Sequence, residues 1–188
     1  MTRFPTPAPE QMTEAQTRLA DTILSGPRGS LDGPFRAWLH APELGDRLQR
    51  VGEQLRFDPI LPPALKEFAI LITACVWRAS FEWYAHYAMA LTAGMDPAKL
   101  APLLDGARPD GMTEDEAAVY DFATGLHRDR QVSDEVYSRV VERFGTEGAV
   151  ELIALCGYYT LVAMTLNVAQ VQAPAADYPS LPPPPVPR

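Results

Sequence analysis

The sequence has little sulfur. Among its 188 residues only Cys75 and Cys156 are cysteines, each inside an apolar run, and neither a CxxC pair nor a Cys/His zinc spacing occurs. This excludes a disulfide scaffold and a cysteine-based zinc domain. Two buried free thiols in a reducing compartment are the simplest interpretation, so we expect a cytoplasmic protein.

Positive charge is also scarce, because 16 basic residues stand against 24 acidic ones and the formal net charge is −8. No basic cluster is interleaved with aromatic residues, which argues against binding to nucleic acid. The N-terminal stretch lacks the apolar segment of a secretory signal. The apolar run 150–169 approaches the length of a membrane span, but it contains Glu151 and Asn167 and no basic flank. We therefore predict a buried helix and no membrane partner.

No segment alternates apolar and polar residues with the period of two that is typical of a strand, whereas signals for helices occur along the chain. Cap residues, prolines in first turns and terminal glycines predict helices over 13–24, 42–55, 62–77, 80–93, 113–127, 133–144 and 146–171. In this scheme Ser80 is an N-cap and Gly94 ends the fourth helix. The sequence therefore predicts an all-α fold, with the apolar segments 65–77 and 149–171 at its centre.

Proline is concentrated at the two ends of the chain, in the N-terminal stretch 1–12 and in a tail that closes with LPPPPVPR. Such segments are extended and poorly ordered. We predict a flexible arm over 1–12, one helical domain over 13–172 and a disordered tail over 173–188.

The stretch FEWYAH places Glu82 and His86 four residues apart, hence on one helix face, in a segment that is otherwise apolar. A carboxylate favours the protonated imidazole and burial opposes it, which suits proton transfer near neutral pH. Glu67, on the preceding predicted helix, reaches His86 if the two helices are antiparallel. These three residues are our candidate catalytic groups.

Other interpretations of these residues stay open at this stage. Glu67 is also consistent with a surface acid near a helix N-terminus, and Glu82 with His86 is consistent with a structural helix pair. A metal site lacks a third ligand at a recognisable spacing, so we predict neither a metal nor another cofactor. Arg78 is equally consistent with a surface cation.

The stretch LPPALKEFAILITACVWRASFEWYAHYAMALTAGM resembles the core of carboxymuconolactone decarboxylase-like proteins, which share a fold with the alkylhydroperoxidase D family. Glu67, then Glu82, Trp83 and His86, then the AG pair ending at Gly94 carry the resemblance, which extends over roughly 26–172. It implies an all-helical homo-oligomer, commonly a trimer or hexamer.

The chain departs from the peroxidase members of this group at the sulfur positions. Those members carry C-x-x-C followed four residues later by histidine, whereas Ala79 and Glu82 stand at these positions here. A thiol peroxidase needs an attacking thiolate and a resolving thiol. The sequence therefore disfavours dithiol peroxidase activity, although peroxiredoxin-like antioxidant activity stays an alternative.

The resemblance, read with these residues, implies a cofactor-free lyase that decarboxylates a small carboxylated or lactone-like substrate. His86 would transfer the proton, Glu82 would orient and tune it, and Glu67 would relay protons. Arg28 or Arg78 would bind a substrate carboxylate, and Trp83 and Tyr84 would line the pocket unless they pack in the core. A non-catalytic module that binds small ligands is the third alternative.

Overall fold

The computed structural model describes residues 3–184, and within that range it contains helices and no strand, which confirms the all-α prediction. The helices are α1 (Glu14–Ser25), α2 (Phe35–Trp38), α3 (Pro42–Phe57), α4 (Pro63–Trp77), α5 (Ser80–Thr92), α6 (Pro97–Leu100), α7 (Glu114–Asp129) and α8 (Asp134–Ala169), with 3₁₀ turns at Pro9–Gln11 and Ala101–Asp105.

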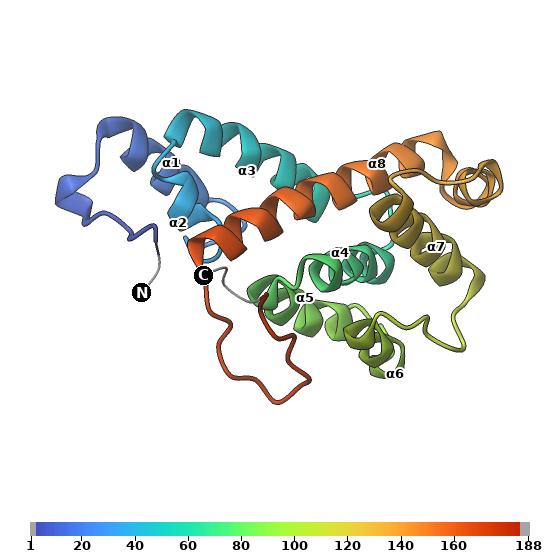
Figure 1. Ribbon diagram of the computed structural model, residues 1–188. Helices are drawn as coiled ribbons and strands as arrows, with labels where there is room; N and C mark the ends of the chain where they lie inside the picture. Colours follow the sequence, from blue (N-terminus) through green and yellow to red (C-terminus); the bar gives the residue numbers. More distant parts are fainter. Residues whose placement is uncertain (1–2, 185–188) are drawn as a thin grey trace.

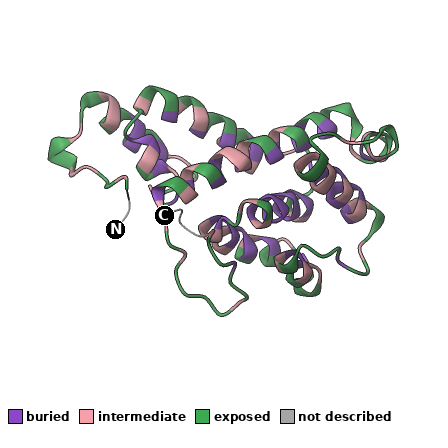
Figure 2. Cartoon of the chain, in the orientation of Figure 1, coloured by how far each residue is buried: buried purple, intermediate pink, exposed green. Residues whose placement is uncertain are grey.

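Helix α4 lies at the centre of the molecule and packs against α5, α7 and α8, while α1 and α2 pack against α3, which in turn contacts α8 (Figure 1). Ten consecutive α4 residues, 65–74, are buried, and Figure 2 shows buried positions along most of this helix. A helix that is apolar on all sides must be enclosed by others. The prediction that this segment forms the core is therefore confirmed for 65–74, whereas Val76 at the end of the helix is exposed.

Helix α8 is kinked at Gly145, whose φ of 72° and ψ of 173° interrupt the helical backbone. This is where the sequence predicts a boundary between two helices, and the positive φ explains why glycine stands there. By length and composition α8 is the one helix of residues 3–184 that could cross a membrane, but half of its apolar window is buried inside the protein. It packs as a core helix against α4 and α7.

Three of the predicted N-caps are present, and Ser80 is not one of them. Thr13 and Thr113 form capping boxes and Ser133 accepts from the Val136 amide. Ser80, however, is not an N-cap, because it is the first residue of α5 and Ala79 occupies the cap position without a side-chain hydrogen bond. Only two residues join α4 to α5, so the second helix begins as soon as the first has turned.

Both terminal segments lie against the helical body, which departs from the free arm and tail expected from proline content. In the arm, the Arg3 amide donates to the Ala169 carbonyl at 3.2 Å, and His40 Nε2 pairs with the Pro5 carbonyl at 3.0 Å. The segment 173–184 returns to α5, where Leu181 is buried. Aromatic and hydrogen-bonding side chains hold this segment against α5 although its prolines keep the backbone extended. The last part of the predicted tail, 185–188, lies outside the described residues.

Candidate active site

The α4–α5 hairpin brings together two of the predicted catalytic residues. His86 Nδ1 lies 2.6 Å from Glu67 Oε2, and both side chains are buried. The hairpin turns through Arg78, whose φ of 50° is left-handed, and Ala79, so the helices run antiparallel. Glu67 occupies Nδ1, and the opposite nitrogen, Nε2, has no protein partner among the described residues.

Glu67 is held in its ionised form by its neighbours. Burial alone would raise the pKa of Glu67, but the hydrogen bond and charge of His86, aided by Lys66, outweigh burial and lower the pKa below its ordinary value. Lys66 Nζ lies 3.3 Å from Glu67 Oε1 and donates to the Arg56 carbonyl at 2.8 Å. A fixed carboxylate on Nδ1 orients the imidazole.

Glu82 stands in the opposite state. It is only 1% exposed, and neither carboxyl oxygen has a hydrogen-bond partner within residues 3–184. Burial therefore raises the pKa of Glu82 well above the ordinary value for glutamate. This corrects the predicted roles, because the partner of His86 is Glu67 on the neighbouring helix and not Glu82 one turn away.

Glu82 and His86 line a cavity of about 240 Å³ between the loop before α2, α3, α5 and α8. Its polar wall also contains Arg28, Arg56, Tyr158 and Tyr159, and its apolar wall contains Phe35, Phe81, Ala85, Val162 and Leu166. Glu67 lines a second, open groove, which shares Arg56 and Ala85 with this cavity. The cavity is smaller than the clefts that hold drug-sized ligands, so it suits a small molecule.

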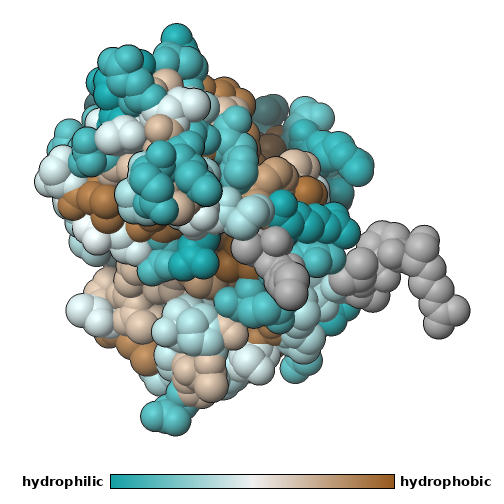
Figure 3. Space-filling view, turned by 90° about the vertical axis from the view of Figure 1, so that its left-hand side faces the viewer, coloured by the Kyte–Doolittle hydropathy of each residue, from teal (hydrophilic) through white to brown (hydrophobic). Residues whose placement is uncertain are grey.

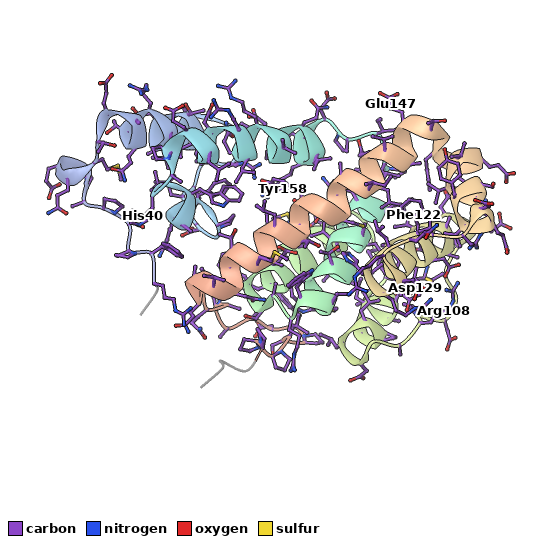
Figure 4. The ribbon with its side chains drawn as sticks, turned by 45° about the horizontal axis from the view of Figure 1, so that its top comes forward. His40, Arg108, Phe122, Asp129, Glu147 and Tyr158 are labelled. Atoms are coloured by element: carbon purple, nitrogen blue, oxygen red, sulfur yellow. The ribbon has the colours of Figure 1, made fainter. Side chains whose placement is uncertain are left out.

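Figure 3 shows the molecule from its left-hand side, where apolar atoms are visible in the indentation between an upper and a lower half. In Figure 4, Tyr158 lies on α8 near α3. Contacts with the Trp38 ring and with the backbone at Gly52 place it there. A side chain at position 52 would collide with the Tyr158 hydroxyl and with Arg28 Nη2, so glycine lets both groups approach α3 closely.

The cavity holds two arginines that no carboxylate of residues 3–184 neutralises, since neither forms an ion pair. The Arg28 guanidinium lies 5.0 Å from the Phe35 ring centre and donates to the Gln49 carbonyl at 3.3 Å. Its Nε is buried without a partner, and burial lowers the pKa of Arg28. Arg56 Nη2 lies 3.3 Å from the Met89 sulfur. Uncompensated guanidinium groups beside a cavity are suited to an anion.

Three of the predicted substrate-binding residues lie outside the cavity. Arg78 is exposed at the α4–α5 turn, where it ends the helix in a left-handed conformation. Trp83 is buried, and its Nε1 donates to the Pro179 carbonyl at 2.7 Å. Tyr84 faces the C-terminal segment, where its carbonyl accepts from the Tyr178 hydroxyl at 2.6 Å. Of the two arginines proposed for the substrate carboxylate, Arg28 lines the cavity and Arg78 does not, and Trp83 takes the core-packing alternative.

Sequence reasoning missed Arg56, Tyr158 and Tyr159. The Tyr159 ring meets His86 edge to face at 5.0 Å, and burial raises the pKa of Tyr158 to about 12 and that of Tyr159 further. Both tyrosines are therefore neutral hydrogen-bonding groups at neutral pH. The available signal was the pair of adjacent hydroxyls inside an otherwise apolar helix.

The cysteines take no part in this site. Neither Cys75 nor Cys156 lines the cavity, and burial raises the pKa of each thiol to about 12. Thiols in this state are poor nucleophiles at neutral pH. Within the described range, no group of three or more His, Cys, Asp or Glu side chains is arranged to hold a metal ion.

The helical arrangement defines a class of fold. It is similar to a Ralstonia eutropha structure described as an alkylhydroperoxidase AhpD core and an uncharacterized peroxidase-related protein, with a TM-score of 0.73 over 92% of each chain at 17% identity. Residues 42–125 match the model of the carboxymuconolactone decarboxylase family. Residues 42–125 are thus similar to the carboxymuconolactone decarboxylase family, and the chain has the predicted AhpD-like fold. No curated protein matches it.

Proposed function

We propose that this protein is a cofactor-free lyase of the decarboxylase type, acting on a small carboxylated or lactone-like molecule by proton transfer. The observation that carries this proposal is the 2.6 Å contact between Glu67 and His86 at the wall of a small cavity that also holds unpaired arginines. An acid–base dyad beside an anion-binding surface is suited to a reaction in which carbon loses CO₂ and gains a proton.

The chemistry assigned to each group follows from its state. When the bond between the substrate carbon and its carboxylate breaks, CO₂ leaves and the electron pair moves into an adjacent conjugated carbonyl as an enolate. Protonated His86 then gives the proton on Nε2 to the carbanionic carbon. Ionised Glu67 holds Nδ1 throughout, and the neutral imidazole that is left recovers a proton on Nε2 from solvent. Arg28 or Arg56 holds a carboxylate that the substrate retains, because binding the departing one would oppose its loss.

The description of the Ralstonia protein as peroxidase-related suggests a thiol peroxidase as the alternative function. Its chemistry requires a thiolate near the histidine. In this chain Glu82 stands at the position four residues before His86, and both thiols have raised pKa values. The geometry therefore favours the lyase.

The test begins with carboxymuconolactone, the compound in the family name, and continues with other small lactone and oxo acids, with CO₂ release as the readout. We expect His86→Gln to lower kcat by about 100-fold or more and Glu67→Gln by a smaller factor, because the imidazole keeps its place but loses its orienting carboxylate. His40→Gln is the matched control, since His40 pairs with Pro5 outside the cavity.

Wild-type turnover by His86→Gln would contradict the assignment. Peroxide consumption that depends on added thiol and disappears in a Cys75→Ser, Cys156→Ser double variant would support the peroxidase instead. Binding of small carboxylates without any turnover would favour a ligand-binding module, the third function considered for this chain.

A further inference from the structure

Glu82 is the one polar group of the cavity wall whose oxygens are fully buried and wholly unsatisfied. An ionised carboxylate in this position would carry a large desolvation penalty with nothing to offset it. No cation of residues 3–184 lies within ion-pair distance, and His86, one turn along α5, is turned to Glu67. The geometry therefore requires a neutral carboxyl group, which has one hydroxyl to donate.

Apart from Arg28 and Arg56, the titratable groups of the cavity wall around this carboxyl are already engaged or neutral. Tyr158 and Tyr159 approach from α8 and are protonated, and the carboxylate of Asp32 is held by Ser30 and Arg36. No protein acceptor in the described part of the chain receives the Glu82 hydroxyl. Its natural acceptor is consequently a group that enters the cavity with the ligand.

The anionic end of such a ligand has its own partners. Arg28 and Arg56 flank the Phe57 ring at 5.7 and 5.3 Å from its centre, and both line the same cavity as Glu82. The Arg28 Nε–H is buried and donates to nothing within residues 3–184. Two guanidinium groups with free donors can bind a carboxylate, and the aromatic wall accommodates an apolar body.

We propose that Glu82 acts in its un-ionised form as a hydrogen-bond donor to a ketone or lactone oxygen of the ligand, while Arg28 and Arg56 bind its carboxylate. The cavity then selects small oxo acids over acids of the same shape that lack the second oxygen. This refines the proposed function, because a donor at that oxygen also stabilises the enolate formed when CO₂ leaves. Glu82 keeps its own proton throughout and is not the group that protonates carbon.

Two matched probe pairs test this selectivity without turnover: 4-oxopentanoate against pentanoate, and 3-acetylbenzoate against 3-ethylbenzoate, each measured by isothermal titration calorimetry. In the wild-type protein we expect at least one oxo acid to bind about tenfold more tightly than its partner. Glu82→Gln supplies an amide donor and keeps a preference. Glu82→Met cannot donate and removes the preference, while the affinity for the partner acid stays within about twofold.

The matched control is Glu142→Gln on the exposed surface of α8, which should change neither affinity. Circular dichroism establishes that each variant is folded. The inference is overturned if no oxo acid is preferred by the wild-type protein, or if Glu82→Met retains the preference. Arg28→Gln should weaken both members of a pair by a similar factor, and selective loss of the oxo acid alone would contradict the assigned ends.

Infrared difference spectroscopy of protein labelled with ¹³C-glutamate gives a readout that needs no ligand. At neutral pH we expect a protonated carboxyl band that is present in the wild-type protein and missing in Glu82→Gln. Absence of that band overturns the inference while leaving turnover that depends on His86 untouched. Conversely, loss of the proposed lyase activity leaves the band and the probe selectivity in place, so the two failures are distinguishable.

Discussion

At the scale of single residues, the site depends on two glutamates that the fold places in opposite states. Glu67 receives a hydrogen bond from His86 and the charge of Lys66, whereas Glu82 receives nothing from residues 3–184. The same side chain is thus a fixed anion in one place and a neutral acid in the other, because partners and burial set the pKa. This division provides one group for orienting a proton carrier and another for binding an oxygen.

Glu82→Met should stabilise the protein by about 1–3 kcal/mol near pH 8, because it removes two unsatisfied oxygens and keeps an unbranched side chain of similar volume. The raised pKa of Glu82 fixes the sign of the pH dependence. The contribution that protonation of Glu82 makes to the free energy of unfolding is fully present below the unfolded-state pKa. It is lost as pH rises toward the folded-state pKa. Urea unfolding at about pH 5 and about pH 8 measures the difference. A variant that is less stable than wild type at the higher pH would contradict this.

The partners of His86 show how far sequence reasoning reaches at this scale. Helical spacing placed Glu82 and His86 on one face, and both do line one cavity. Spacing could not show that Glu67 would take the Nδ1 hydrogen bond, since that depends on how α4 and α5 meet. Arg56 and Tyr159 come from helices far away in the sequence, so no local pattern could connect them with His86.

At the scale of elements, the site depends on how closely α3 approaches α8. Gly52 permits this approach, because any side chain there would meet the Tyr158 hydroxyl and the Arg28 guanidinium. The sequence predicted both helices and nearly all of their ends. It did not show their crossing, because a glycine inside a helix gives no sign of which neighbour it admits.

We expect Gly52→Ala to leave the free energy of unfolding within about 1 kcal/mol of wild type, since better helix propensity offsets the displacement of two flexible side chains. Binding of benzoate should nevertheless weaken by about tenfold, because Tyr158 and Arg28 are pushed into the cavity. Urea unfolding and calorimetry separate the two effects. Gly157→Ala on α8, where the space is open, is the matched control. Unchanged benzoate affinity in Gly52→Ala would refute the argument.

The C-terminal segment behaves as part of the helical body around α5. The Tyr178 ring stacks on Tyr87 at 4.6 Å, Leu181 is buried, and the Pro179 carbonyl accepts from Trp83. Composition predicted an extended segment but could not show that two side chains and one backbone carbonyl would anchor it. Prolines restrict the backbone, and that restriction lowers the entropy lost on docking.

A chain that ends at residue 172 should therefore lose about 2–4 kcal/mol of stability, since it forfeits one buried leucine and one stacked tyrosine. Chemical unfolding of the shortened and full-length chains measures this loss. Removal of the last four residues alone, 185–188, is the control, because those anchors remain in place. Equal stability of the chain ending at 172 and the full-length chain would show that the anchors contribute nothing in solution.

At the scale of the whole molecule, the fold is similar to an AhpD-like structure along 92% of each chain, although identity is only 17%. Such a similarity fixes the scaffold and leaves the chemistry open. The acid–base residues and the two arginines are particular side chains placed on that scaffold. Which side chains of α5 face the cavity depends on the rotation of this helix about its axis, which only the complete packing determines.

The outer face of α8 leads us to propose that the protein assembles with further copies of itself, as expected from the resemblance. Val150, Ile153, Met164 and Val168 are exposed along one side of this helix. Their spacing, with Gly157 between them, follows the repeat by which two helices pack together. Exposed apolar stripes of this kind are usually covered by a partner.

We expect light scattering to show a homo-oligomer, a trimer or a hexamer, and Ile153→Asp to shift it toward the monomer at micromolar concentration. The matched control Glu142→Asp should keep the assembly. A monomeric wild-type protein would contradict the proposal, as would an oligomer that Ile153→Asp leaves intact.

Both sulfur atoms lie outside the cavity, and this affects how the protein reacts with oxidants and alkylating reagents. With each thiol un-ionised near neutral pH and no sulfur beside His86, alkylating reagents and peroxides find no fast-reacting target at the site. Oxidative stress inactivates enzymes that depend on thiols, but it should not inactivate the proposed activity of this protein. The rate of the proposed reaction would depend on the substrate concentration and not on the redox state of the cell.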